Sequence, residues 1–238
     1  MPAIQALLIV LYTLVIGTLA MAACLILPRT GAFTGLARLW SWLILKTLGV
    51  RYTAAYHPRV DPSRPSVYVA NHQSQLDIPV LMLAMPVDFR VVTKRELLFV
   101  PVFGWALWMA GFIFIDRGDR ERAIRSLERA ARKVRRGTSI VVFAEGTRSP
   151  DGRLLPFKKG GFILALQAGV PIVPVVIRRG HDLLPKGSLR PRRGTMEIGF
   201  GEPIETSTYR WETKDLLIEA VRERIAAALA TENLLKST

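Results

Sequence analysis

Residues 66–77 read SVYVANHQSQLD, and this stretch decides the fold of the chain. Its first five residues, Ser66–Ala70, are small, β-branched or aromatic, which is typical of a short buried strand. A polar loop follows, and Asp77 precedes Ile78 and Pro79. Because proline is tolerated in the first turn of a helix, Asp77 is expected to be a helix N-cap. The stretch therefore predicts a strand, a polar loop and a helix in succession.

Short apolar runs and helical patterns continue to alternate along the chain. The runs expected to be buried strands are Ser66–Ala70, Phe89–Thr93, Phe112–Ile115, Ser139–Phe143 and Ile172–Ile177, with a late strand at Thr195–Ile204. The segments expected to be helices are Asp77–Met85, Arg120–Arg136, Gly161–Ala168 and Lys214–Leu229. Strands that alternate with helices favour an α/β fold. We therefore expect a mixed, largely parallel sheet flanked by helices.

An apolar N-terminus precedes this pattern. No side chain from Met1 to Pro28 is charged, and the run Ala3–Leu27 exceeds the roughly 20 apolar residues that cross a bilayer. A signal peptide would need a positive n-region and a shorter apolar core, so an anchor is favoured. A second apolar segment, Leu36–Val50, follows a break at Pro28–Gly31. We expect the two segments to form a membrane-binding helical hairpin.

Basic residues fix the expected side of the membrane. Four of them come after Pro28: Arg29, Arg38, Lys46 and Arg51. Positive residues beside an anchor stay in the cytoplasm. We therefore expect residues 1–50 to anchor the protein in the cell (inner) membrane and residues 51–238 to form a domain on its cytoplasmic face. The sequence leaves open whether the first helix spans the bilayer or enters one leaflet.

A third uncharged run, Leu97–Ile115, has 19 residues and could be read as a second span. Pro101, Gly104 and Gly111 interrupt it, and a compact apolar block closes it. An interfacial or buried helix followed by a buried strand fits this pattern better than a span does.

Composition limits the classes of protein that the chain can belong to. The 238 residues carry 33 Lys and Arg against 19 Asp and Glu, a formal net charge of +14, and half of them are hydrophobic. So apolar a composition excludes a disordered chain. The single cysteine, Cys24, excludes an internal disulfide and a cysteine-based metal cluster. The positive charge indicates an anionic partner, either nucleic acid or an acidic membrane surface.

His72 and Asp77 form the pair of residues that best suits catalysis. On a continuous helix five steps rotate a side chain by about 140°, so the two residues would not share a face. If Asp77 begins the helix, His72 lies in the loop before it and can fold back onto the carboxylate. That contact would fix the imidazole tautomer and stabilise its protonated form, as a general base requires. Because no serine or cysteine nucleophile stands out, we expect the substrate to supply the attacking hydroxyl.

Basic residues and glycines follow the other predicted strands. They occur in four groups: Lys94 and Arg95, Asp116 and Arg117, Glu145–Arg148, and Lys158–Gly161. The carboxyl ends of parallel strands meet at one edge of a sheet, where ligands bind. Cationic side chains beside glycines whose backbone can approach a ligand suit a phosphate group. A single basic residue would be an ordinary surface charge, but the repetition after successive strands predicts a phosphate site.

Four blocks of the sequence, in this order, resemble the motifs of the glycerolipid acyltransferases, specifically the 1-acylglycerol-3-phosphate acyltransferases. The blocks are Asn71-His72 through Asp77 (N-H-x-x-x-x-D), Gly111–Arg117 (GFIFIDR), Phe143–Arg148 (FAEGTR) and Val170–Val175 (VPIVPV). The likeness covers roughly residues 50–205, and four ordered motifs are far more specific than one. One departure is Ala144, where the family generally has proline. We expect it to affect the stiffness of the loop or the preference for the acceptor rather than to abolish activity.

The resemblance implies a reaction and a set of site residues. His72, oriented by Asp77, would remove the proton from the sn-2 hydroxyl of a lysophosphatidate, whose oxygen then attacks an acyl thioester. The residues that the resemblance assigns to the acceptor phosphate are Arg117, Glu145, Gly146, Thr147 and Arg148, with Asn71, Lys94 and Lys158 as further candidates. Glu145 would organise this site, with pairing to an arginine as one way to do so. No cofactor and no metal are implied, and the donor would be acyl-CoA or acyl carrier protein.

Two other interpretations remain alongside this one. The same chemistry could act on glycerol-3-phosphate, another lysophospholipid or a lyso-aminolipid. A non-catalytic, membrane-anchored basic binding protein would also suit the charge, although the chain has no recognisable nucleic-acid module. A metal hydrolase needs about three protein ligands, and only His72 has a suitable neighbourhood. The motifs do not indicate the acyl-chain preference, the choice between acyl-CoA and acyl carrier protein as donor, or the oligomeric state.

Overall fold

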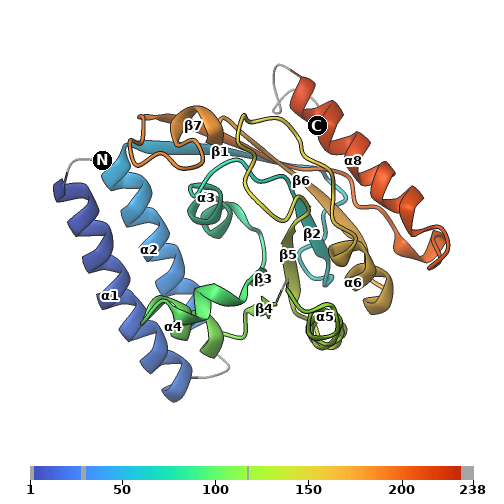
Figure 1. Cartoon of the computed structure of the whole chain (residues 1–238), viewed down its shortest axis with the longest axis horizontal. Coiled ribbons are helices and arrows are strands. Elements are labelled where there is room, and N and C mark those ends of the chain that lie inside the picture. Colours follow the sequence, from blue (N-terminus) through green and yellow to red (C-terminus); the bar gives the residue numbers. More distant parts are fainter. Residues whose placement is uncertain (1–2, 28–30, 117, 232–238) are drawn as a thin grey trace.

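The protein is described by a computed structural model that covers residues 3–27, 31–116 and 118–231. A seven-stranded sheet runs through its centre in the order β1-β7-β6-β2-β5-β3-β4 (Figure 1). The strands are β1 Val50–Tyr56, β2 Val67–Ala70, β3 Phe89–Lys94, β4 Ile113–Ile115, β5 Ser139–Phe143, β6 Ile172–Arg178 and β7 Gly194–Phe200. Neighbouring strands are parallel except β6 and β7, which are antiparallel. The predicted mixed, largely parallel α/β sheet is confirmed.

Helices cover both faces of the sheet (Figure 1). They are α1 Ala3–Ile26, α2 Ala32–Leu48, α3 Asp77–Ala84, α4 Phe103–Met109, α5 Arg120–Arg135, α6 Gly160–Ala168, α7 Gly180–Leu183 and α8 Lys214–Ala230, with 3₁₀ turns η1 Arg95–Phe99 and η2 Thr206–Thr208. Because successive strand residues point to opposite faces, Tyr68 and Ala70 pack with α2 and α3, whereas Val67 and Val69 pack with α5, α6 and α8. This double burial explains why the central strands read as continuous apolar runs.

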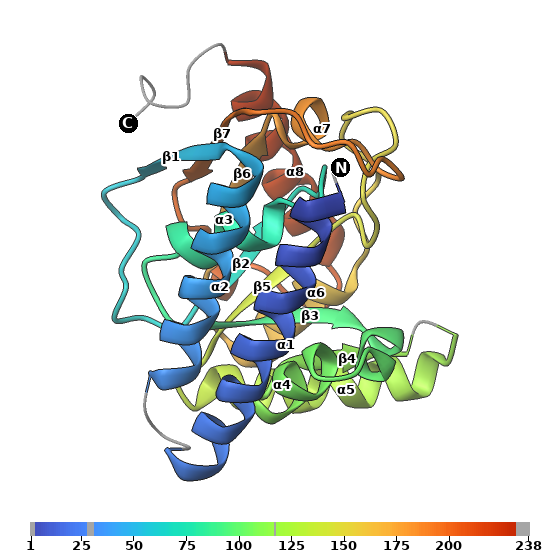
Figure 2. The same ribbon diagram turned by 90° about the vertical axis from the view of Figure 1, so that its left-hand side faces the viewer.

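The N-terminal helices lie side by side along one flank of the domain (Figure 2). Two polar contacts join them: Gln5 donates to the carbonyl of Thr47 at 3.0 Å, and the Trp40 indole donates to the Thr13 hydroxyl at 3.1 Å. Helix α1 also packs against α4, where a side chain in place of Gly17 would lie 2.6 Å from a Val102 methyl group. The close approach of these two helices therefore requires glycine at this position.

The outer face of α1 is apolar and unpartnered within the described part of the chain. Its exposed large side chains are Ile4, Leu7, Val10, Leu11, Leu14, Val15, Leu19, Leu25 and Ile26. By length and composition α1 is long and apolar enough to cross a membrane. Exposed Trp105 and Trp108 on neighbouring α4 extend the apolar surface. A surface of this size and composition is typical of contact with lipid.

The structure corrects several element boundaries. The second apolar segment was expected to be helical through Val50, but α2 ends at Leu48 and Val50 begins β1, a strand that the sequence did not reveal. The late strand ends at Phe200, and Ile204 retains only an isolated bridge to Ile172. The run Leu97–Ile115 contains the end of η1, then α4 and β4, so the expected helix followed by a strand is confirmed. Most of the expected break at Pro28–Gly31 lies outside the described residues.

Tyr68 and Tyr56 allow the contribution of a tyrosine hydroxyl to stability to be compared with and without a hydrogen-bond partner. Both rings contact Phe200, with centroids 6.1 and 4.9 Å away. Burial raises the pKa of Tyr68 to about 12, and its hydroxyl has no hydrogen-bond partner among the described residues. The Tyr56 hydroxyl donates to the carbonyl of Ala84 at 2.5 Å.

Tyr68→Phe removes an unsatisfied buried hydroxyl, so we expect the free energy of unfolding to rise by about 1 kcal/mol. Tyr56→Phe removes the hydrogen bond to Ala84 and should lower the free energy of unfolding by a similar amount. Thermal unfolding of the two variants in the same detergent measures both effects. A loss of stability in Tyr68→Phe would mean that the hydroxyl has a partner in solution.

Candidate active site

The site lies where the carboxyl ends of β2, β3 and β5 meet. His72 follows β2, Lys94 ends β3, and Glu145–Arg148 follow β5. Strands β3 and β2 pair with opposite edges of β5, all in parallel, so the loops after them leave the sheet in the same direction. Parallel pairing thus brings together three loops that are far apart in the sequence.

His72 and Asp77 form a close pair. The His72 Nδ1 atom lies 2.7 Å from Oδ2 of Asp77, whose side chain is fully buried, whereas the His72 side chain is 18% exposed. The same carboxylate oxygen accepts the backbone N–H groups of Gln73 at 2.7 Å and Ser74 at 2.9 Å. If Nδ1 carries a proton toward the carboxylate, Nε2 is left as the basic nitrogen. The geometry matches that of a general base held in one tautomer.

The role of Asp77 in the helix differs from the expected N-cap. Asp77 is the first residue of α3, and Leu76 occupies the N-cap position without a side-chain cap. The carboxylate turns back toward the loop that precedes the helix, where it accepts the N–H groups already described. Asp77 therefore shapes the histidine loop rather than capping α3.

Glu145 supports the histidine from behind. Its side chain is buried, its Oε1 accepts the backbone N–H of His72 at 2.7 Å, and its Oε2 accepts that of Leu155 at 2.9 Å. Burial raises the pKa of Glu145, and these two hydrogen bonds partly offset that effect. Both oxygens thus face backbone amides, so Glu145 organises the site by holding two loops together, and no arginine of the described residues pairs with it.

Glu145→Gln tests this role. An amide nitrogen would face one of the two N–H groups, leaving that donor without an acceptor at a cost of about 1–3 kcal/mol. We expect thermal unfolding to show a loss of this size. Glu128→Gln on the exposed face of α5 is the control and should unfold like the unmodified protein. Equal stability of all three proteins would show that Glu145 does not hold the loops.

Asn71 joins the ends of two strands. Its amide group donates to the carbonyl of Ile177 at 2.9 Å and accepts the N–H of the same residue at 2.8 Å. Ala144, where related motifs have proline, donates its N–H to the carbonyl of Ala70 at 3.0 Å. A proline could not make this bond. The loops after β2 and β5 are therefore fixed to the sheet beside His72, the first by the Asn71 side chain and the second by a backbone hydrogen bond.

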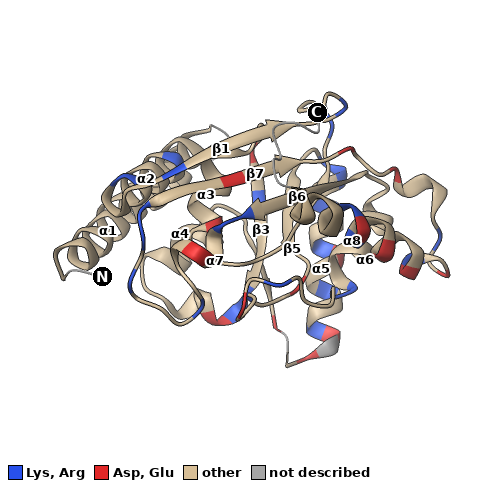
Figure 3. Ribbon diagram, turned by 90° about the horizontal axis from the view of Figure 1, so that it is seen from above, with Lys and Arg blue, Asp and Glu red and all other residues tan. Residues whose placement is uncertain are grey.

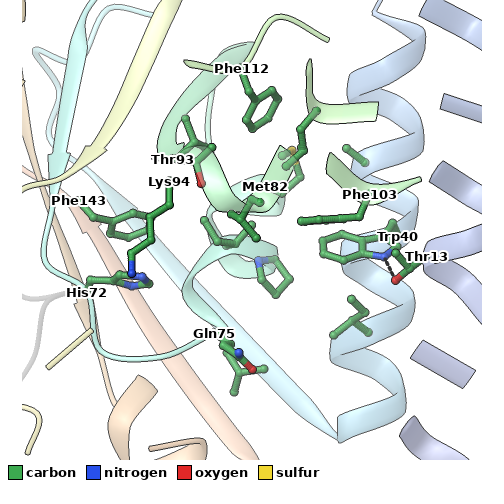
Figure 4. Close-up of a pocket in the computed structure, with 18 of the residues that line it drawn as sticks. Thr13, Trp40, His72, Gln75, Met82, Thr93, Lys94, Phe103, Phe112 and Phe143 are labelled. Carbon is green, nitrogen blue, oxygen red and sulfur yellow. Dashed lines mark hydrogen bonds between the residues drawn. The ribbon is translucent and has the colours of Figure 1, made fainter. Parts of the chain in front are cut away.

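A cavity of about 660 Å³ opens beside the pair. Helices α1 to α4 supply its apolar end, where Trp40 and Thr13 lie opposite His72 (Figure 4). Its other end is basic: Lys94, Arg148 and Lys186 line it, and Lys94 extends toward His72 in Figure 4. The His72 ring stacks on Phe143 with centroids 3.9 Å apart. The cavity thus combines an apolar chamber, a basic mouth and a histidine between them.

The expected site residues fall into three groups in space. Those that line the cavity are His72, Lys94, Gly146, Thr147 and Arg148. Those that lie behind its wall are Asn71, Asp77 and Glu145, each buried. Lys158 is exposed and is not part of the lining. Arg117 lies outside the described residues.

One basic residue of the lining, Lys186, was not predicted from the sequence. Lys186, in the loop after α7, donates from its amine to the hydroxyl of Thr147 at 3.3 Å. No motif or strand end marked this lysine, because its loop reaches the site only through the tertiary fold. Across the described ranges, no group of three or more His, Cys, Asp and Glu side chains is placed to hold a metal ion.

Comparison with known proteins gives a consistent result. The family model described as Acyltransferase matches residues 52–178. A chloroplastic 1-acyl-sn-glycerol-3-phosphate acyltransferase of Brassica napus is 38% identical over 165 residues, 69% of this chain and 46% of that protein. The human 1-acyl-sn-glycerol-3-phosphate acyltransferase alpha is 34% identical over 212 residues, 89% of this chain and 75% of that protein.

A solved structure agrees over nearly the whole chain. The crystal structure of the 1-acyl-sn-glycerophosphate (LPA) acyltransferase PlsC from Thermotoga maritima matches with a TM-score of 0.79 and 26% identity, and the match covers 96% of both chains. The chain spans about half the length of the plant relative and three quarters of the human one. With a family model over more than half of its length and relatives above 30% identity, the chain belongs to the acyltransferase family.

Proposed function

We propose that this protein transfers an acyl group from an acyl thioester to the sn-2 hydroxyl of 1-acyl-glycerol-3-phosphate, which gives phosphatidate. The observation that carries the proposal is the His72–Asp77 pair, 2.7 Å apart, between an apolar chamber and a basic mouth. The relatives named above act, by their names, on 1-acyl-sn-glycerol-3-phosphate. An acceptor with an acyl chain and a phosphate monoester fits both ends of such a cavity.

In the proposed reaction, Nε2 of His72 accepts the proton of the sn-2 hydroxyl as the oxygen attacks the thioester carbonyl. Asp77 stays ionised and stabilises the imidazolium that forms. The tetrahedral intermediate then collapses, the carbon–sulfur bond breaks, and the departing thiolate takes the proton from Nε2. No acyl-enzyme forms in this scheme, and it needs no cofactor. Cys24, the single cysteine, lies in α1.

Basic side chains would hold the acceptor phosphate. Lys94 and Arg148 line the mouth, and Gly146 and Thr147 line the cavity beside them. Arg117, in the second motif, is proposed to join them. A bidentate arginine contact suits phosphate oxygens, and a nearby lysine adds a point charge. Charge at the mouth would keep the phosphate there while the acyl chain occupies the apolar end.

The membrane would deliver the acceptor. We place α1 within one leaflet of the cell membrane, with the sheet domain on the cytoplasmic side. Helix α1 bonds laterally to α2 through Trp40 and Gln5, and five of its residues line the cavity, which favours a helix that lies on the domain over one that leaves it. Trp105 and Trp108 would sit at the level of the headgroups.

An acyl-transfer assay tests the proposal. The full chain in detergent is incubated with an acyl-CoA and 1-acyl-glycerol-3-phosphate, and phosphatidate and free thiol are measured. We expect both products in equal amounts, with acyl carrier protein tested as the second donor. Activity only with glycerol-3-phosphate or with a phosphodiester lysolipid would show that the proposed acceptor is wrong and the proposed acyl-transfer chemistry is right. No transfer to any of these acceptors from either donor would refute the proposal.

Arg148→Ala should raise the Michaelis constant for the acceptor about tenfold or more. A lost hydrogen bond to a charged group is worth about 1.5–3 kcal/mol, and 1.4 kcal/mol is a factor of ten. The measurement is initial rate against acceptor concentration at saturating donor. Arg153→Ala is the control, because this arginine follows in the same loop with its side chain 88% exposed. If only the Michaelis constant for the donor changed, Arg148 would not bind the acceptor phosphate.

A further inference from the structure

The loop between α7 and β7 is strongly basic. Residues 184–193 read LPKGSLRPRR, and they contain four cations and no acidic residue. The acidic residues on either side are already engaged: Asp182 pairs with Arg179 at 4.0 Å and Glu197 with Arg178 at 3.4 Å. No carboxylate in the described part of the chain pairs with these four positive charges, which lie within eight residues and repel one another, so a bound anion would be strongly favoured.

The loop has a fixed shape. A tight turn begins at Pro185, where the N–H of Ser188 donates to the Pro185 carbonyl at 3.1 Å and Gly187 adopts a φ of +84°. The Ser188 hydroxyl then accepts the N–H of Arg190 at 3.1 Å. Farther along, the N–H of Arg192 donates to the carbonyl of Leu183 at 2.7 Å. The backbone is therefore held in place, with Arg190 and Arg192 exposed.

The loop borders the mouth of the active-site cavity. Lys186, Ser188, Leu189 and Pro191 belong to the cavity lining, and Lys186 bonds to Thr147. Figure 3 shows basic segments along this loop, whereas α1 beside it carries no charge. The cations thus continue outward from the mouth, beyond the groups proposed for the acceptor phosphate.

We propose that this loop binds the phosphate groups of the nucleotide half of an acyl-coenzyme A donor. The inference rests on the proposed function, because it places the donor thioester at His72 and its phosphates outside the mouth. Three arginines lie within residues 190–193. Arginine forks match phosphate oxygens bidentately, and a cluster this compact fits a pyrophosphate and a phosphate monoester better than carboxylates spread along the surface of a carrier protein.

The test compares two donors that differ only in the nucleotide: a long-chain acyl-CoA and the matching S-acyl-pantetheine. The variant is Arg190→Gln/Arg192→Gln, made in the full chain. We expect its Michaelis constant for acyl-CoA to rise at least tenfold, while that for S-acyl-pantetheine and that for the acceptor do not rise. The control, Arg125→Gln/Arg132→Gln, removes two exposed charges from α5 and should leave all three constants unchanged.

A binding measurement separates this inference from the proposed function. Adenosine 3′,5′-bisphosphate is titrated calorimetrically into the unmodified protein and into both variants, and binding should be lost only in Arg190→Gln/Arg192→Gln. Binding with this pattern but without acyl transfer would refute the proposed function and keep the nucleotide site. Acyl transfer with equal acyl-CoA constants in all three proteins would refute the nucleotide site alone. Reduced binding to anionic phospholipid vesicles without a change in donor constants would instead assign the loop to the membrane surface.

Discussion

Replacing His72 with alanine should lower kcat for acyl transfer by roughly a hundredfold to ten-thousandfold, the range that a positioned general base contributes. His72 lines the cavity, and its Nδ1 is held 2.7 Å from a fully buried carboxylate. Alanine has no basic nitrogen that could take the proton of the acceptor hydroxyl. The readout is the initial rate of phosphatidate formation at saturating donor and acceptor.

The control for this variant is His57→Ala. His57 follows β1 rather than β2, and its ring accepts the N–H of Arg59 at 3.3 Å instead of facing a buried carboxylate. We expect normal turnover in this protein, and thermal unfolding should show that both variants are folded. Near-normal turnover in His72→Ala would exclude His72 as the base, and the proposed proton transfer would have to be assigned to another group.

Asp77→Asn and Asp77→Ala should separate two functions of one carboxylate. Oδ2 of Asp77 accepts from His72 Nδ1 and from the N–H groups of Gln73 and Ser74. An asparagine oxygen in the same place can still accept from all three donors, but it carries no charge to stabilise the imidazolium. We therefore expect a folded protein whose kcat is lower by about a hundredfold or more.

Asp77→Ala removes the acceptor altogether and leaves buried donors unpaired. The expected loss is on the order of 3 kcal/mol in the free energy of unfolding, in addition to the loss of activity. Chemical denaturation measures the stabilities of the two variants, and the acyl-transfer assay measures their rates. If Asp77→Asn kept full turnover, Asp77 would be a structural residue of the loop and not the partner of a base.

Local patterns were enough to predict most of the sheet and the central pair of the site. Strand β5 was predicted to the residue, because Ser139–Phe143 is a buried apolar run between clear boundaries. The proximity of His72 to Asp77 was predicted because the helix was expected to begin at Asp77, which leaves His72 in a loop that can fold back onto the carboxylate. Both features depend on residues within one short stretch, where propensity and spacing carry the information.

Features that depend on distant contacts could not be predicted in the same way. Strand β1 alternates between buried and exposed positions at an edge of the sheet, and its pairing with β7 joins residues 50–56 to residues 194–200. Glu145 was placed near the phosphate, but its two hydrogen bonds reach His72 and Leu155. Lys186 enters the site from a loop that no motif marks. Such contacts become visible only when the chain is folded.

The packing of α1 on the domain has a consequence for how this protein can be altered. Ile9, Ile16 and Gly17 line the cavity and also belong to the long apolar helix α1. A truncation at residue 50 that aims at a more soluble fragment would therefore open the cavity as it removes this helix. A substitution that changes the bulk of the apolar face of α1 is subject to the same constraint, because residues of that helix also set the shape of the cavity.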